Sequence, residues 1–179
     1  MKVLFIITCS MFLAVATNAA QTCPADSIPA STPDSQLIDN NDGTITDLKT
    51  GLTWKKCLEG VFGDFCENGS PNVFTWQQAL QHPGTVNDDE GFADYTDWRL
   101  PNIRELFSLV EIQCSDPAIN RNRFPNTPSS DVWSGSPCVD FCGEGCFDYS
   151  AWKVNFNYGK SSNPSRNSTY AVRLVRGGR

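Results

Sequence analysis

Residues 97–106 read Asp97-Trp98-Arg99-Leu100-Pro101-Asn102-Ile103-Arg104-Glu105-Leu106, and they mark the point where a helix must begin. Pro101 ends any preceding strand and holds the residue before it in an extended conformation. Asn102 can then cap a helix, and Glu105 can bond back to that cap, as in a capping box. We predict a helix over residues 102–112. Its buried face should carry the apolar residues at helical spacing, which are Ile103, Leu106, Phe107 and Val110.

Strand patterns lie on both sides of this helix. Before it, β-branched and aromatic residues alternate with polar ones over residues 44–47 and 52–55, which predicts a hairpin. A short helix should begin after Thr75, which Gln78 can help to cap, and residues 83–96 should form a loop. The buried face of that helix is expected to consist of Trp76, Ala79 and Leu80. Near the C-terminus, strands are expected over Val132–Ser134, Ala151–Tyr158 and Tyr170–Arg176.

Two helices, strands at both ends of the domain and a loop-rich second half indicate an α+β domain with a mostly antiparallel sheet and long loops. In the strand predicted over residues 151–158, apolar and polar side chains alternate, so each group takes one face. The aromatic residues expected in the core of this region are Trp133, Trp152, Phe156 and Tyr158. Trp133 and Trp152 flank a cysteine-rich loop, and one of them could instead line a sugar-stacking surface.

The first twenty residues have the pattern of a secretory signal peptide. Lys2 gives a positive start, an apolar segment follows, and small residues precede the expected cleavage point. We expect residues 1–20 to be removed, residues 21–35 to form an irregular arm, and residues 36–179 to form one domain. No other apolar run approaches the about 20 residues that span a membrane, so no membrane insertion is expected. The expected location is secreted, periplasmic or at the cell surface.

The charge of the chain excludes some partners. Without Lys2, 13 basic and 20 acidic side chains remain, a net charge of −7. This acidic balance argues against non-specific binding of nucleic acid. The charge is uneven, because the segment from Ser150 to Arg179 contains six basic residues and no acidic ones. Acidic residues gather instead over 88–97, where a calcium site is an open alternative to a solvated surface.

Seven cysteines follow the expected signal peptide, and in an exported protein they predict a disulfide framework. One bridge should close a short loop between a strand and a helix, a second should tie the arm to the end of the second helix, and a third should cross a hairpin. These bridges are Cys57–Cys66, Cys23–Cys114 and Cys138–Cys146, with Cys142 left free. A zinc site is disfavoured, because the chain has one histidine and no Cys-x-x-Cys pair.

Several segments occur in the same order as in one bacterial family. Besides residues 97–106 they are Thr44-Ile45-Thr46-Asp47, Thr50-Gly51-Leu52-Thr53-Trp54, Trp152-Lys153-Val154-Asn155-Phe156 and Val172-Arg173-Leu174-Val175-Arg176-Gly177-Gly178. Over roughly residues 36–178 the chain resembles the family typified by the C-terminal domain of the Legionella collagen-like adhesin. The resemblance implies a C-type-lectin-like fold, in which the terminal strands pair and long loops carry binding.

The same resemblance implies binding of sulfated polysaccharides and trimer assembly through a collagen-like stalk. This chain departs from the family on both points, because it has no Gly-x-y repeat and its net charge is negative. Affinity for sulfated glycans would therefore depend on the basic C-terminal segment. An anionic glycan needs several cations acting together. The candidate ligand-binding residues are Lys153, Lys160, Arg166, Arg173 and Trp152.

Catalytic signatures are scarce in this sequence. The single histidine, His82, is expected at a helix end, with no nucleophile signature near it. Arg99 and Glu105 are expected to form a scaffold pair or separate helix-start contacts. We therefore predict a non-catalytic, adhesin-like recognition domain for an extracellular polysaccharide or another surface polymer, without cofactor or metal. Oligomer formation stays open.

Two other functions are alternatives. Residues 98–101 and the terminal Val175-Arg176-Gly177-Gly178 also resemble motifs of the formylglycine-generating enzymes, which share the C-type-lectin-like fold and use reactive cysteines. The extra cysteines of this chain lie over residues 138–146 and do not match that arrangement. An enzyme of this type is therefore the weaker hypothesis. The other alternative is a structural component of the cell envelope that binds no small ligand.

Overall fold

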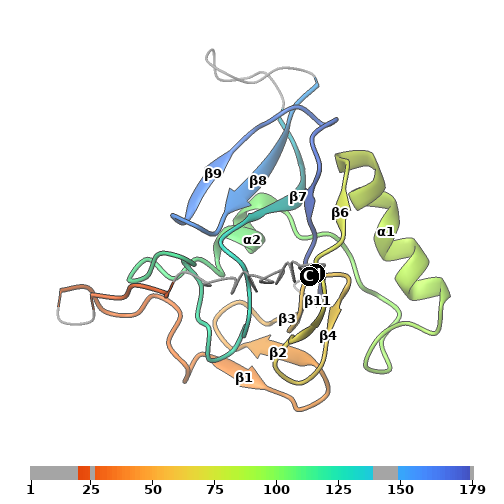
Figure 1. Cartoon of the computed structure of the whole chain (residues 1–179). Coiled ribbons are helices and arrows are strands. Elements are labelled where there is room, and N and C mark those ends of the chain that lie inside the picture. Colours follow the sequence, from red (N-terminus) through yellow and green to blue (C-terminus); the bar gives the residue numbers. More distant parts are fainter. Residues whose placement is uncertain (1–19, 25–26, 139–148, 178–179) are drawn as a thin grey trace, which may run out of the picture.

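The computed structural model describes residues 20–24, 27–138 and 149–177. Within them the chain forms two helices, α1 (Trp76–Asp88) and α2 (Ile103–Phe107), and three β-sheets, which confirms the α+β class (Figure 1). The predicted disulfides Cys23–Cys114 and Cys57–Cys66 are both present. Cys138 is also disulfide-bonded. Its predicted partner, Cys146, and the predicted free Cys142 lie outside the described residues.

The first sheet joins the beginning and the end of the domain. Its strands are β1 (Leu37–Asp39), β2 (Thr44–Asp47), β3 (Leu52–Lys55) and β11 (Val175–Gly177), in that order and all antiparallel. Strands β2 and β3 form the predicted hairpin, in which Ile45 lies opposite Trp54. Both of these side chains are fully buried, because residues directly opposite each other on paired strands point to the same face of the sheet.

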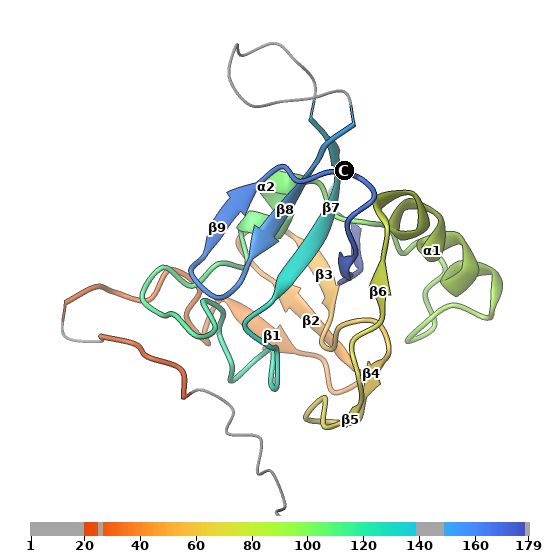
Figure 2. The same cartoon turned by 45° about the horizontal axis from the view of Figure 1, so that its top comes forward.

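The second sheet contains five strands. They are β6 (Val73–Phe74), β10 (Tyr170–Ala171), β7 (Asp131–Pro137), β8 (Ala151–Asn155) and β9 (Lys160–Ser162), in that order. Strands β10 and β7 run parallel, and the other neighbours are antiparallel. A short pair, β4 (Val61–Phe62) and β5 (Asn68–Gly69), forms the third sheet. Both views place β6 between α1 and the rest of the five-stranded sheet (Figures 1 and 2).

Two predicted strands are shorter than expected. The strand predicted over residues 151–158 ends at Asn155, whose side chain accepts a hydrogen bond from the Tyr158 N–H at 3.2 Å and closes a turn. Tyr158 is therefore 64% exposed, not part of the core. The strand predicted over residues 170–176 is divided between β10 and β11, which belong to different sheets. Between β10 and β11, the carbonyls of Leu174 and Val172 accept from the backbone N–H groups of Lys55 and Glu59. This segment therefore crosses from one sheet to the other.

Helix α2 begins as predicted and ends early. Asn102 accepts from the Glu105 N–H at 2.9 Å, and the Glu105 carboxylate accepts from the Asn102 N–H at 2.8 Å, which completes the capping box. The helix stops at Phe107 instead of residue 112, since tighter i→i+3 turns follow. Phe107 is 39% exposed, which corrects the expected buried face, whereas Ile103 is half-buried and packs against the core. Leu106 and Val110 are buried as predicted.

Helix α1 is longer than predicted. The capping box of Thr75 and Gln78 is confirmed. The helix then continues through Pro83 to Asp88, although a proline inside a helix removes one hydrogen bond. Pro83 and Ala79 are four residues apart and both buried, so they pack on the same side of the helix. Leu80 is 44% exposed, which contradicts its predicted place in the buried face.

Two clusters of buried apolar side chains form the core. The larger joins both of the main sheets to α2, and it includes Phe156, as predicted. The smaller lies beneath α1 and contains Trp133, which is fully buried and so does not line a surface. Trp152 is half-buried on β8. The smaller cluster packs α1 against the five-stranded sheet.

Candidate functional site

Arg173 lies in the interior of the domain. Its side chain is 1% exposed, and it donates to Thr127 Oγ1 at 2.8 Å and to the backbone carbonyls of residues 55–56. The guanidinium carbon lies 4.8 Å from the ring centre of Phe124. Burial lowers the pKa of Arg173 to about 9, against the charge of Glu59, which raises it. Arg173 holds the residues after β3 in place, which corrects its predicted position on an exposed surface.

The other predicted cations do not form a common charged surface with it. Lys153 is 8% exposed, and its Nζ lies 2.5 Å from Asp131 Oδ1. The Arg166 side chain donates to the Ser150 carbonyl at 3.0 Å and lies over the ring of Trp76. Of the four predicted cations, Lys160 alone is exposed. Three of the four charges are thus held inside the domain or against its own groups.

A cleft of about 480 Å³ opens beside the Lys153–Asp131 ion pair, where β7 and β10 begin and β8 ends. We name it the sheet cleft. Its volume falls within the range of about 300–1,000 Å³ that is usual for small-molecule sites. Its wall is formed by segments far apart in the sequence, which are Pro71, Val73, Pro128–Asp131, Asn155 and Thr169–Ala171.

The polar groups of the sheet cleft are already positioned by contacts within the chain. Asp131 and Asn155 lie directly opposite each other on β7 and β8, and Asn155 Nδ2 donates to Asp131 Oδ1 at 2.8 Å. The same oxygen accepts from Lys153, so the two charges balance. Among the described residues, no group donates a hydrogen bond to the second carboxylate oxygen, Asp131 Oδ2. The cleft therefore presents a fixed acceptor without a net charge.

An aromatic ring and apolar side chains form the rest of the sheet cleft. Tyr170 is half-buried and makes an edge contact with Trp133, with ring centres 4.8 Å apart. Lys153 Nζ lies 5.0 Å from the centre of the Tyr170 ring. Val73, at the rim, is 60% exposed. A ring and a branched aliphatic side chain beside fixed polar groups suit a ligand that has both an apolar face and hydroxyl groups.

A second cleft, of about 610 Å³, lies between β6 and α1, and we name it the helix cleft. Pro71 and Val73 line both clefts, so this segment is the ridge between them. The other lining residues are Asn72, Phe74, Gln78, Gln81, His82 and Thr85. Most of these are neutral groups that both donate and accept hydrogen bonds.

His82 is bonded at the base of the helix cleft. Its Nε2 lies 2.7 Å from Glu59 Oε2, and its ring centre lies 4.7 Å from that of Phe74. Glu59 is 6% exposed and forms a second ion pair with Lys55 at 2.8 Å. Burial raises the pKa of Glu59, but the His82 hydrogen bond and Lys55 outweigh it, so the pKa lies below its ordinary value. The predicted helix-end position of His82 is wrong, because α1 continues to Asp88.

The ridge between the clefts is held rigidly from below. The Asn72 N–H donates to the Glu59 carbonyl at 2.8 Å. Gly60 follows with φ +87°, and a Cβ added there would lie 2.6 Å from the Ser70 carbonyl oxygen. Only glycine fits this close approach and this backbone conformation. Residues 70–72 are thus fixed against the loop that carries Glu59.

Sequence reasoning did not identify the residues of these clefts. Asn155 had a usable signal, because it shares the polar face of a predicted strand with Lys153. Tyr170 and Asp131 had none, since the β10–β7 pairing that brings their segments together joins distant parts of the chain.

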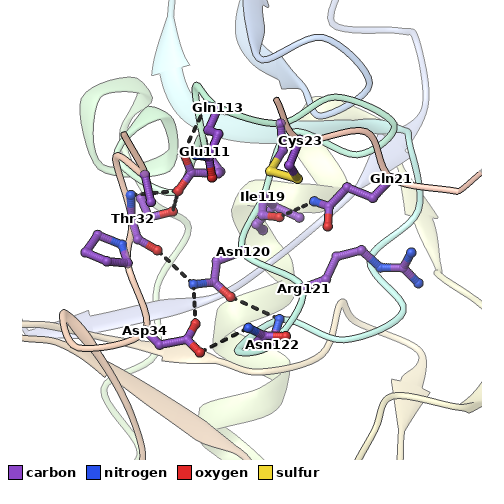
Figure 3. Close-up of a pocket in the computed structure, with 13 residues that line it drawn as sticks. Gln21, Cys23, Thr32, Asp34, Glu111, Gln113, Ile119, Asn120, Arg121 and Asn122 are labelled. Carbon is purple, nitrogen blue, oxygen red and sulfur yellow. Dashed lines mark hydrogen bonds between the residues drawn. A yellow bond between two sulfur atoms is a disulfide. The ribbon is translucent and has the colours of Figure 1, made fainter. Parts of the chain in front are cut away.

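A third pocket, of about 320 Å³, lies beside the Cys23–Cys114 disulfide and the N-terminal arm (Figure 3). The Glu111 carboxylate accepts from the backbone N–H groups and hydroxyls of residues 31–32 and from the Gln113 N–H. Asp34 accepts from the side-chain amides of Asn120 and Asn122. Because these acceptors are used within the chain, the network serves to hold the arm against the domain.

The sequence matches the Lcl C-terminal domain family over residues 43–176, which is most of the chain. The chain belongs to this family. No curated protein matches its sequence. Both clefts beside β6 fall within the matched range of the Lcl C-terminal domain, whereas part of the third pocket precedes it, namely Gln21, Cys23, Ala30 and residues 32–34.

Two further findings on the described part of this Lcl C-terminal domain concern metal ions and membranes. No group of three or more His, Cys, Asp and Glu side chains there is placed to hold a metal ion. In the acidic segment, Asp97 is paired with Arg176 at 2.7 Å, and Arg176 lies over the ring of Tyr95. No helix among the described residues is long and apolar enough to cross a membrane.

Proposed function

We propose that this Lcl C-terminal domain is an exported, non-catalytic recognition domain that binds an extracellular glycan in the sheet cleft. Membership of a family named for an adhesin domain supports a binding role. The disulfides Cys23–Cys114 and Cys57–Cys66 are consistent with an oxidising compartment, outside the cytoplasm. We place the protein in the periplasm, at the cell surface or in the medium.

The C-type-lectin-like fold belongs to the same proposal. Pairing of β11 with β3 joins the C-terminal strand to the first hairpin, which is the arrangement that this fold class requires. Segments without regular strands or helices supply much of the sheet-cleft wall, including residues 128–130 and Thr169. Binding by loops on a disulfide-linked scaffold is the use of the fold that we infer.

The proposal depends on one observation: the hydrogen-bonded Asp131–Asn155 pair lies beside the Tyr170 ring in the same cleft. A sugar ring presents C–H groups on its faces and hydroxyl groups at its edge. The Tyr170 ring can pack on the C–H face, and the Asp131 carboxylate and Asn155 amide can form hydrogen bonds with the hydroxyl groups. Because Lys153 and Asn155 already orient Asp131, little ordering of the site is needed on binding.

A glycan array probed with the oxidised, labelled chain tests this function. We expect binding to a defined group of glycans, and we expect Asp131→Ala and Tyr170→Ala each to abolish most of the signal. Tyr158→Ala is the matched control for Tyr170→Ala, because Tyr158 is exposed and does not line the cleft. Thermal unfolding of each variant separates a lost contact from a lost fold.

Three results would contradict the proposal. Binding that survives both cleft variants would place the ligand elsewhere on the domain. Turnover of any substrate, abolished by a single cysteine or carboxylate substitution, would favour an enzyme of the formylglycine-generating type. A folded domain that binds no glycan would favour a structural role in the envelope.

A further inference from the structure

We infer that the sheet cleft and the helix cleft are neighbouring subsites for one chain of uncharged sugars, which crosses β6 over Pro71 and Val73. This inference rests on the proposed glycan binding and adds to it the charge and the length of the ligand. The ligand is an internal segment of a neutral polysaccharide, not a single terminal sugar.

The two clefts are adjacent. Pro71 and Val73 belong to the walls of both, and Val73 is 60% exposed at the top of the ridge. Strand β6 lies at the edge of the five-stranded sheet, on the side toward α1 (Figures 1 and 2). A ligand bound in one cleft therefore meets the other on passing this short strand, and the exposed valine offers it an apolar contact at the crossing.

Charge in both clefts is balanced within the protein. Asp131 in the sheet cleft is paired with Lys153. His82 in the helix cleft is bonded to Glu59, which in turn is paired with Lys55. The other side chains that line the two clefts carry no acidic or basic group. A sulfated or carboxylated sugar would find no free cation there, whereas an uncharged one meets no charge that it must desolvate without a partner.

The groups of the helix cleft complement hydroxyls. Gln81 and Thr85 are exposed on α1, on the side that faces the ridge. An amide side chain offers both donors and an acceptor, so it can bond hydroxyl groups of either polarity. The ring of Phe74, which contacts that of His82 at a tilted angle, adds an aromatic surface to the same wall. This combination repeats that of the sheet cleft.

The ridge is fixed before any ligand binds. The hydrogen bond from Asn72 to Glu59 and the close approach of Gly60 hold residues 70–72 in place. Two subsites on a rigid support keep a constant separation. A ligand long enough to fill both therefore gains the second set of contacts without a second cost of association.

Isothermal titration with three neutral size series tests this inference on the oxidised full chain. The probes are linear glucose, mannose and N-acetylglucosamine oligomers of one to six residues. We expect at least one series to bind, with an affinity that rises steeply with length and then levels once both clefts are filled. Gln81→Ala should weaken the longest oligomer of that series about fivefold to tenfold and leave the shortest binding oligomer unchanged, since one hydrogen bond is lost.

Gln77→Ala is the matched control, because Gln77 is an exposed glutamine of the same helix outside the cleft. Binding without a length dependence, or indifference of the long oligomer to Gln81→Ala, would overturn the two-subsite inference and leave glycan binding intact. Binding of sulfated sugars on the array together with failure of all three neutral series would overturn the neutral class. Failure of every glycan would overturn the proposed function itself.

Discussion

Arg99 and Glu105 form a two-pronged ion pair, in which each of two guanidinium nitrogens lies 2.7 Å from a different carboxylate oxygen. The same guanidinium donates to the Gly177 carbonyl at 2.9 Å, and the same carboxylate accepts from the Asn102 N–H at 2.8 Å. One pair of side chains thus joins the start of α2 to the end of β11. The sequence-based alternative of two separate helix-start contacts is excluded by this geometry.

Glu105→Ala should destabilise the domain by about 1–3 kcal/mol, because it removes the ion pair together with half of the capping box. Burial raises the pKa of Glu105, but the hydrogen bonds from Arg99 and Asn102 outweigh it and hold the pKa below its ordinary value. Urea unfolding at neutral pH measures the loss. The control is Arg104→Ala, an exposed position of the same helix, which should stay within about 0.5 kcal/mol of the parent.

Leu106→Ala should cost about 2–5 kcal/mol, since the fully buried side chain leaves a cavity in the larger core cluster. Phe107→Ala, one residue further, should cost far less, because Phe107 is 39% exposed. The difference between the two unfolding free energies checks both statements. Equal costs would mean that α2 packs through a different face.

The local features of the fold were predictable because they depend on neighbours in the sequence. Asn102 with Glu105, and Thr75 with Gln78, each form a cap from residues three apart, and both capping boxes are present. The burial of Leu106 follows from the same local spacing. The pairing of Cys57 with Cys66 follows likewise from a short loop.

Features that depend on tertiary packing were not predictable in this way. Helical spacing marked Leu80 and Phe107 as buried, yet the partner surfaces do not extend over them and both are exposed. Pro83 suggested a helix end, but its burial beside Ala79 keeps the helix intact. Arg173 looked like a surface cation, since sequence alone does not reveal the carbonyl groups that surround it.

Glu111 should make the stability of the domain depend on acid pH. Burial raises the pKa of Glu111, but hydrogen bonds from Ser31, Gln113 and Thr32 lower it by a larger amount. The pKa in the folded domain therefore lies below the ordinary 4.5. The unfolded chain therefore binds a proton more readily than the folded one. The stabilisation is complete above the ordinary pKa and is lost as the pH falls through the folded value.

The test is urea unfolding from about pH 6 to about pH 3, where the parent should lose stability as carboxylates protonate. Glu111→Gln should be less stable than the parent at the upper pH and should lose less on acidification. Glu90→Gln, at an exposed position just after α1, should follow the parent curve. A Glu111→Gln curve parallel to that of the parent would show that this carboxylate does not contribute.

Salt distinguishes the neutral clefts from a cationic surface as the binding site. Screening weakens attraction between exposed charges over a distance of about 10 Å at about 0.1 M salt. The groups expected to bind sugar are uncharged side chains and Asp131, whose charge is already paired with that of Lys153. The affinity for a neutral oligomer should therefore change less than about twofold between about 0.05 and about 0.5 M sodium chloride. Lys160→Ala should leave it unchanged, since Lys160 is exposed on β9 and lines neither cleft. A steep fall with salt, removed by combined Lys160→Ala and Arg166→Ala substitutions, would instead assign binding to an anionic polymer on the basic C-terminal segment.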